Sequence, residues 1–134
     1  MATIRMNKDD KNRIAHSVAP LEYTIDASGR TLGRVASDAA QALLGKKSAQ
    51  YVQNKVLPVT VTITNAKQLK LSEKRLSEKE YTRYTGNVGG LRRFTLPELI
   101  EKKGVAAAIE KAVDGMIPRN KLRKERMKRL IITD

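Results

Sequence analysis

The strongest constraint on the fold is a strict alternation of apolar and polar residues in the sequence VTVTITNA at residues 59–66. Its valines and isoleucine would lie on one face of a β-strand, because successive side chains of a strand point to opposite sides. The sequence YTIDA at residues 23–27 alternates in the same way and predicts an earlier strand. Between the two, apolar residues recur at helical intervals from Leu32 to Leu43. This order predicts a right-handed βαβ unit of a parallel sheet.

The first predicted helix has recognisable ends. Thr31 stands where an N-terminal capping residue is expected, and Gly45 stands where a left-handed residue often ends a helix. Lys46 and Lys47 follow at the negative end of the helix dipole.

A second helix is predicted after residue 95. Thr95 and Glu98 form a T-x-x-E capping box, and Pro97 lies in the first turn. An apolar stripe then runs at helical spacing from Val105 to Met116. A glycine and a proline near the end of the stripe are typical of a helix terminus.

The last apolar segment, LIIT at residues 130–133, predicts a strand that closes the sheet. The order of elements therefore predicts an α/β fold of three layers, with a mainly parallel sheet of about four strands and helices packed on both faces. Residues 67–82 are highly charged and repeat the sequence LSEK. Because that repeat is too short to be architectural, a loop or a short hairpin is expected there.

The length of 134 residues fits one domain, and we expect residues 21–134 to form it. Residues 1–20 mix charges without periodicity and end at Pro20. They predict an N-terminal extension that is flexible or becomes ordered on a partner. A strand fragment at residues 14–18 is the alternative for part of it.

The charge balance points to a polyanionic partner. The chain has 27 Lys and Arg against 14 Asp and Glu, which gives a net charge of +13. Solubility of a small domain is served by a net charge of about 2 to 8. The excess favours a nucleic-acid partner, with an anionic membrane surface or simple solubility as alternatives.

Several classes of site lack the residues that they need. With no cysteine there is neither a disulfide framework nor a thiolate metal site, and the single His16 builds neither a zinc site nor a Ser-His-Asp triad. No apolar run approaches the ~20 residues that span a bilayer, and no signal-peptide pattern follows the first residue. We therefore expect no metal, no cofactor, no small-molecule substrate and no membrane contact, and a cytoplasmic location.

The sequence RYTGNVGGLRRF at residues 83–94 is the first candidate binding site. It lacks the Gly-Lys-Ser/Thr of a P-loop and the G-x-G of a dinucleotide fingerprint. It contains the G-x-x-G of KH domains, but a KH loop joins two helices, whereas the preceding KEYTRYT is typical of extended chain. Its glycines would let the main chain approach RNA closely and its arginines would bind phosphates. Tyr81 and Tyr84 are available for stacking on an unpaired base. A solvated turn is the alternative.

The second candidate is the basic segment PRNKLRKERMKR at residues 118–129, of which residues 119–129 hold seven basic side chains and one acidic side chain. If the segment is helical, Leu122, Arg126 and Met127 would lie on a narrow inward edge and the other cations would point outward. We nevertheless include Arg126 among the expected RNA contacts. The alternative is a solvated charged face.

A third pair, Asp26 and Asn65, stands at the carboxyl ends of the two predicted strands. Ligands of open α/β sheets bind at that edge, so the pair is compatible with a nucleotide-using enzyme. The alternative is structural: Asp26 would make a turn hydrogen bond before Ser28, and Asn65 would end its strand. No histidine, cysteine or second clustered carboxylate supports acid–base chemistry there.

Four segments resemble, in order, the motifs of the bacterial large-subunit ribosomal protein L-thirteen family. They are YTIDASGRTLGRVAS (residues 23–37), VTITNA (61–66), YTRYTGNVGGLRR (81–93) and EKAVDGMIPRNKLRKERMKRL (110–130). The resemblance spans residues 22–134. It implies a three-layer α/β fold that binds large-subunit ribosomal RNA, acts early in subunit assembly and has no catalytic role. It also implies neighbouring ribosomal proteins as partners, namely the L-three and L-twenty families.

The family's motif positions carried over to this chain are Arg83, Gly86, Gly89, Gly90, Leu91, Gly115, Met116, Pro118, Asn120 and Leu122. The chain departs from the family at Tyr84, where a histidine is usual, at Asn87 and Val88, where Tyr-Pro is usual, and at Arg123, where glycine is usual. Residues 46–58 also lack the family's acidic residues and its Gly-Asp step.

The leading hypothesis is therefore an RNA-binding structural protein of the large ribosomal subunit. The residues expected to contact RNA are Lys46, Lys47, Arg83, Tyr84, Gly86, Gly89, Gly90, Arg92, Arg93, Arg119, Asn120, Lys121, Arg123, Lys124, Arg126 and Lys128. The rivals are an architectural DNA-binding protein, for which no helix-turn-helix, zipper or β-arm pattern is present, and the nucleotide-using enzyme.

Overall fold

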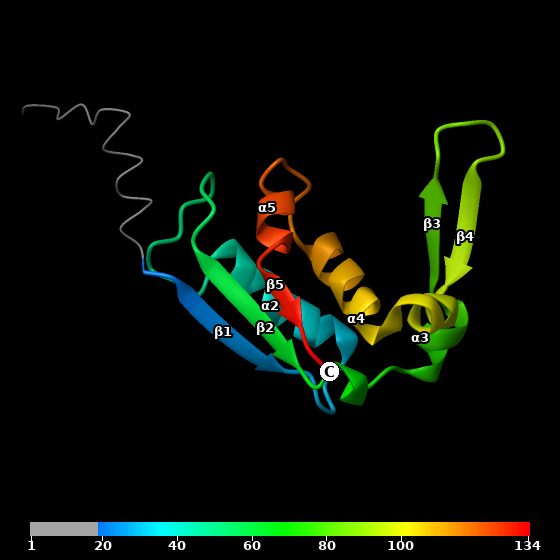
Figure 1. Cartoon of the computed structure of the whole chain (residues 1–134), viewed down its shortest axis with the longest axis horizontal. Helices are drawn as coiled ribbons and strands as arrows, with labels where there is room; N and C mark the ends of the chain where they lie inside the picture. Colours follow the sequence, from blue (N-terminus) through cyan, green and yellow to red (C-terminus); the bar gives the residue numbers. More distant parts are fainter. Residues whose placement is uncertain (1–18) are drawn as a thin grey trace, which may run out of the picture.

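A three-stranded parallel sheet forms the centre of the protein, seen in a computed structural model that describes residues 19–134 (Figure 1). Its strands are β1 (Leu21–Asp26), β2 (Val59–Thr64) and β5 (Leu130–Ile132), in the order β1-β2-β5. All three predicted strands are confirmed. The prediction for residues 1–20, including the strand fragment, lies outside the described residues except for the last two.

The central strand β2 alternates between the core and the surface, as its sequence predicts. Val59, Val61 and Ile63 are at most 1% exposed, whereas the threonines between them are partly exposed. Ile63 pairs with Ile25 of β1 and with Ile132 of β5. The three isoleucines thus form one apolar row across the sheet.

Helix α2 (Leu32–Leu44) follows β1 and confirms the predicted βαβ unit. Its buried face is made largely of alanines, which allow close packing against the sheet and against helix α4 (Leu96–Met116). Gly45 ends α2 with a φ of 82°, a left-handed conformation that favours glycine. Thr31 occupies the N-terminal capping position, but its side chain makes no capping hydrogen bond.

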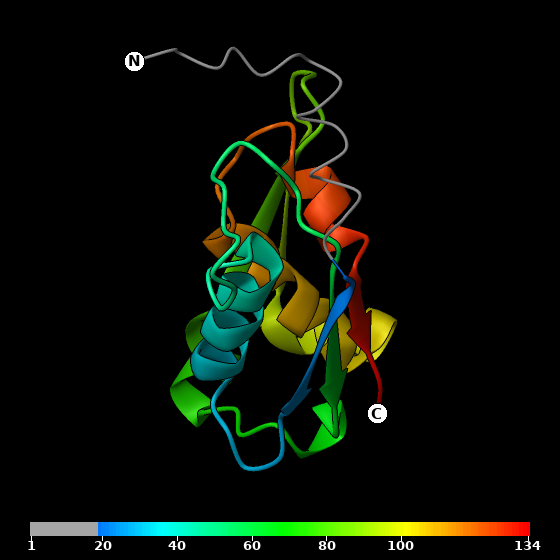
Figure 2. The same ribbon diagram turned by 90° about the vertical axis from the view of Figure 1, so that its left-hand side faces the viewer.

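The layering differs from the prediction. The parallel sheet has three strands rather than about four, and Figure 2 shows α2 and the second half of α4 on the same side of it. The threonine face of β2 is partly exposed instead of lying under helices. The alternating sequence explains this, because strands covered on both faces carry nearly continuous apolar residues.

A second, smaller unit follows the sheet in sequence. It contains a 3₁₀ turn η1 (Ala66–Gln68), helix α3 (Glu73–Glu78) and an antiparallel hairpin of β3 (Glu80–Tyr84) and β4 (Leu91–Thr95). The expectation of a loop or short hairpin at residues 67–82 was therefore wrong in part, because α3 occupies its centre. The unit has its own core around Leu96, Leu99 and Ala108. Figure 1 shows α3 and the hairpin to one side of the main sheet.

Helix α4 connects the two cores and is interrupted at Gly104, whose φ of 81° and ψ of 171° are not helical. Before the break, Leu96 and Leu99 belong to the small core. After it, Ala108 still packs in the small core, whereas Ile109 and Val113 belong to the main core. The helix begins with the predicted capping box, in which the Thr95 amide donates to Glu98 Oε2 at 3.3 Å.

Candidate nucleic-acid interface

The hairpin has two faces of different chemistry. In its register Arg83 lies opposite Arg92, and Tyr81 lies opposite Phe94. These four residues share the face turned toward α4, since alternate residues of a strand lie on one side. Like charges directly across a strand pair are destabilising. The paired arginines therefore do not serve the hairpin's own stability.

The aromatic pair fixes the base of the hairpin. The rings of Tyr81 and Phe94 stack with centroids 5.6 Å apart, and Lys111 Nζ lies 5.3 Å and 5.5 Å from the two centroids. Burial in this cluster raises the pKa of Tyr81 above its ordinary value. Tyr81 is thus engaged in packing and is not free to stack on a base, whereas Tyr84 is 64% exposed.

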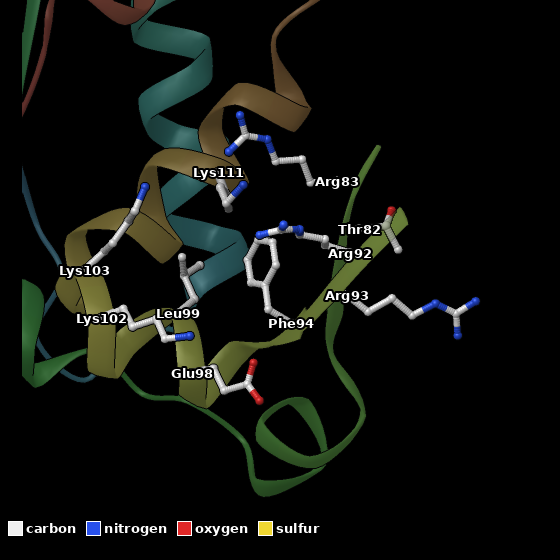
Figure 3. Close-up of a pocket in the computed structure, with 10 residues that line it drawn as sticks. All are labelled: Thr82, Arg83, Arg92, Arg93, Phe94, Glu98, Leu99, Lys102, Lys103 and Lys111. Atoms are coloured by element: carbon white, nitrogen blue, oxygen red, sulfur yellow. The ribbon is translucent and has the colours of Figure 1, made fainter. Parts of the chain in front are cut away.

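A first hollow of about 450 Å³ lies between the hairpin and α4 (Figure 3). Arg83, Arg92 and Lys111 extend into the same space above the ring of Phe94, whereas Arg93 extends away from the opposite side of the strand. Lys102 and Lys103 of α4 complete its cationic lining. The only acidic residue there among the described residues is Glu98, which the capping box already holds.

A second hollow of about 820 Å³ lies between α4 and the terminal basic segment and shares Leu99, Lys103 and Lys111 with the first. We call the two together the basic groove. Its cations are Arg83, Arg92, Lys102, Lys103, Lys111, Lys121, Arg123, Lys124 and Lys128. Arg93 borders the first hollow, but its side chain extends from the opposite side of the strand and is not counted among them (Figure 3). These nine cations face three acidic residues, Glu98, Glu110 and Asp114, in the part of the chain that the structure describes.

One groove cation is paired within the protein. Arg123 Nε lies 3.2 Å from Asp114 Oδ1. The other two ion pairs found in residues 19–134 join Arg30 to Asp38 and Lys67 to Asp134, outside the groove. The groove therefore retains a strong positive charge.

The terminal segment is less helical than predicted. Helix α5 covers only Arg123–Met127, and Asn120 precedes it in a turn in which its Oδ1 accepts from the Leu122 amide at 3.1 Å. The turn competes with helix formation, as asparagine side chains commonly do. Asn120 also lines the groove, whereas Arg119 is exposed outside it.

The expectation that Arg126 contacts RNA is corrected by its burial. Arg126 is 2% exposed and donates from Nη2 to the carbonyls of Lys55 and Gln53, at 3.3 Å and 3.5 Å. Arg129 makes a similar bond to the Leu57 carbonyl at 3.2 Å. Arg126 thus fastens the segment before β2 to α5, and its guanidinium does not reach a ligand in this conformation.

Lys46 and Lys47 lie exposed after α2, away from the residues that line the groove. Lys47 Nζ lies 5.6 Å from the ring centroid of Tyr23, at the edge strand of the sheet. The structure therefore does not bring these two lysines together with the other predicted cations.

The glycines at the hairpin tip are required by the turn itself. Gly86 and Gly89 have φ angles of 90° and 74°, and a side chain on Gly90 would collide with Thr85. Positive φ is strained for residues with a Cβ atom. The tip glycines are thus explained by backbone geometry, whatever the tip contacts.

Asp26 and Asn65 lie together at the carboxyl edge of the sheet, but their hydrogen bonds stabilise the local turn, which is the structural alternative to a ligand site. Asn65 Nδ2 donates to Asp26 Oδ1 at 3.0 Å, and the amide and hydroxyl of Ser28 donate to the same carboxylate. These bonds, that of Asn65 foremost, lower the pKa of Asp26 from 3.8 to about 2. Within residues 19–134 no group of three or more histidine, cysteine or acidic side chains is arranged to hold a metal ion.

Three groove residues were missed by the sequence reasoning: Lys102, Lys103 and Lys111 of α4. Each is exposed on a helix that was interpreted through its apolar stripe alone. Helical spacing places Lys103 and Lys111 on the same side of an ideal helix, but Gly104 lies between them and changes that geometry. In the described part of the chain, no helix is long and apolar enough to span a membrane.

Comparison with known proteins gives a consistent result. Residues 21–133 match the family model described as Ribosomal protein L13. Proteins named "Large ribosomal subunit protein uL13" are 41% identical in Moorella thermoacetica, over 86% of this chain and 79% of the relative, and 40% identical in Clostridioides difficile, over 81% and 75%. Another with that name, in Dehalococcoides mccartyi, is 43% identical over 75% of this chain and 69% of the relative. The chain therefore belongs to the ribosomal protein L13 family.

Proposed function

We propose that this protein is a structural constituent of the large ribosomal subunit and binds large-subunit ribosomal RNA through the basic groove. It would act in the cytoplasm, as part of the ribonucleoprotein that performs translation, with no catalytic step of its own. The names of its relatives support the ribosomal role. Residues 21–134 would form the RNA-binding domain.

The observation that carries this proposal is the charge of the groove. Nine cations line it against three acidic residues in the described chain, and two of those acids are held by the Thr95 amide and by Arg123. Arg83 and Arg92 face each other across the hairpin despite their repulsion. A phosphate between them would remove that repulsion and supply charge-assisted hydrogen bonds.

The groove also explains how such a protein would support early assembly. Its walls come from the hairpin and from the terminal segment, and its floor comes from α4. An RNA strand bound there would contact three separated parts of the chain at once. Phosphate contacts of this kind fix position and shape rather than sequence. We also propose that ribosomal proteins of the L-three and L-twenty families lie next to this protein in the particle.

The experiment compares two double variants of equal charge. In Lys103→Gln with Lys124→Gln both substitutions lie in the groove, and in Lys67→Gln with Lys74→Gln both lie outside it. Binding to deproteinised large-subunit ribosomal RNA is measured at increasing salt concentration. Each lost phosphate contact makes the slope of log K against log salt less steep by about 0.7 to 0.9. The slope of the groove variant should therefore be less steep than that of the parent by about 1.5.

The control variant should keep the parental slope. Equal slopes for the two variants would contradict the groove as the binding site. Preference for double-stranded DNA over the ribosomal RNA in direct competition would instead favour the architectural DNA-binding rival.

A further inference from the structure

The hairpin's second face combines an exposed aromatic ring with an arginine. Tyr84 lies opposite Leu91, and both alternate with Arg83 and Arg92, so they lie on the side away from the groove. Tyr84 is 64% exposed and Leu91 is 52% exposed. Arg93 extends from this same side of the strand (Figure 3). We call Tyr84, Leu91 and Arg93 the outer face.

Folding does not account for this face. Tyr81, three residues earlier, lies on the inner side and stacks on Phe94 in the small core. Tyr84 contributes to neither core, and among residues 19–134 its hydroxyl has no hydrogen-bond partner. An aromatic side chain that projects from a strand into solvent is suited to contact a binding partner.

We propose that Tyr84 stacks on an unpaired base of RNA while Arg93 binds a flanking phosphate. The inference rests on the proposed function and deepens it. The hairpin would then stand between two RNA elements, with phosphates on its inner side and one splayed base on its outer side. Single-stranded bases are commonly recognised in this way, by an aromatic platform with a neighbouring cation.

Charge and size favour RNA over a protein partner. The hairpin sequence from Tyr81 to Thr95 contains three arginines and no acidic residue, which suits an anionic occupant. The outer face has only two large apolar side chains, together with Val88 at the tip. A stable protein interface buries about 1,200 Å² or more in total, far beyond such a patch.

The experiment substitutes the ring. Tyr84→Ala should weaken binding to deproteinised large-subunit ribosomal RNA by about 5- to 100-fold, the effect of losing one stacked base. Its salt slope should stay at the parental value, because no cation is removed. Tyr84→Phe keeps the platform and should stay within about 2-fold of the parent. The matched control is Tyr51→Ala, which removes a 38% exposed tyrosine outside the hairpin and should have no effect.

Irradiation of the complex at short ultraviolet wavelength provides a second measurement. A crosslink between RNA and a peptide containing residue 84 is expected for the parent and for Tyr84→Phe. If Tyr84→Ala binds as well as the parent while the groove variant loses slope, the base platform is refuted and the proposed function stands. If neither variant changes binding, both fail. If Tyr84→Ala binds naked RNA normally but is lost from assembled subunits, the face binds a protein and the inference is overturned.

Discussion

Gly104 should be the position at which a single methyl group most clearly weakens the protein through its backbone. Its φ of 81° and ψ of 171° fall in a region that is essentially reserved for glycine. An added Cβ would meet nothing within 4 Å, so collision contributes no cost. Gly104→Ala therefore isolates backbone strain at the junction of the two cores.

The magnitude follows from two opposing effects. A residue with a side chain in such a conformation costs about 1–3 kcal/mol. Alanine also restricts the unfolded chain, which returns about 0.4–1 kcal/mol. The free energy of unfolding should thus fall by about 1–2 kcal/mol. At a typical denaturant dependence for a small protein, the urea midpoint would fall by roughly 1 M.

Gly115→Ala is the matched control, because it makes the same substitution in the same helix with the opposite expected sign. Gly115 has helical backbone angles, and its Cβ would also meet nothing within 4 Å. Replacing glycine by alanine inside a helix stabilises by about 0.5–1 kcal/mol. Urea unfolding followed by circular dichroism gives both values. If Gly104→Ala leaves the midpoint unchanged or raises it, as Gly115→Ala should, the backbone argument at Gly104 is refuted.

Three further predictions concern other positions. The pKa of Asp26 is about 2 in the folded protein against 3.8 normally, so its ionised form contributes stability above about pH 4 that is lost as the pH falls toward 2. Asp26→Asn should flatten that part of a thermal-stability profile, and an unchanged profile would contradict the hydrogen bonds. Arg126→Ala should lower the free energy of unfolding by about 1–3 kcal/mol and leave the salt slope of RNA binding unchanged. Lys124→Ala should leave the free energy of unfolding unchanged and make the salt slope of RNA binding less steep. Glu98→Ala removes the acceptor of the Thr95 amide and should cost about 0.5–1.5 kcal/mol in a urea titration.

The main sheet was predictable because its information is local. β1, α2 and β2 each have apolar residues at a regular spacing, and those residues face the core in the folded protein. Gly45 ends α2 as the sequence predicts. The small unit was not predictable in the same way. Its core joins Leu76 of α3 to Phe94 of the hairpin and Leu99 of α4, and each element contributes too few apolar residues to show a period.

The fold brings many of the predicted cations together in one groove, but the sequence did not show the position of each side chain. A run of cations in the sequence does not say which side chain turns inward, so Arg126 was assigned to RNA although the fold buries it. Lys103 and Lys111 escaped notice for the converse reason. They become part of the groove only when α4 breaks at Gly104 and the hairpin folds back beside it.

The groove depends on both cores, which lie on either side of the break in α4. The hairpin wall rests on the small core, and the terminal wall rests on the main core through Met127 and Leu130. Lys103, which lines both hollows, is the residue immediately before Gly104. The kink at Gly104 therefore lies in the floor of the groove, next to this lysine and between the two walls. A ligand that contacts both walls gains from a spacing fixed before it binds, since less order remains to be imposed on binding. Glycine, which adopts this conformation without steric strain, thus lets the helix bend at the point where the site needs it.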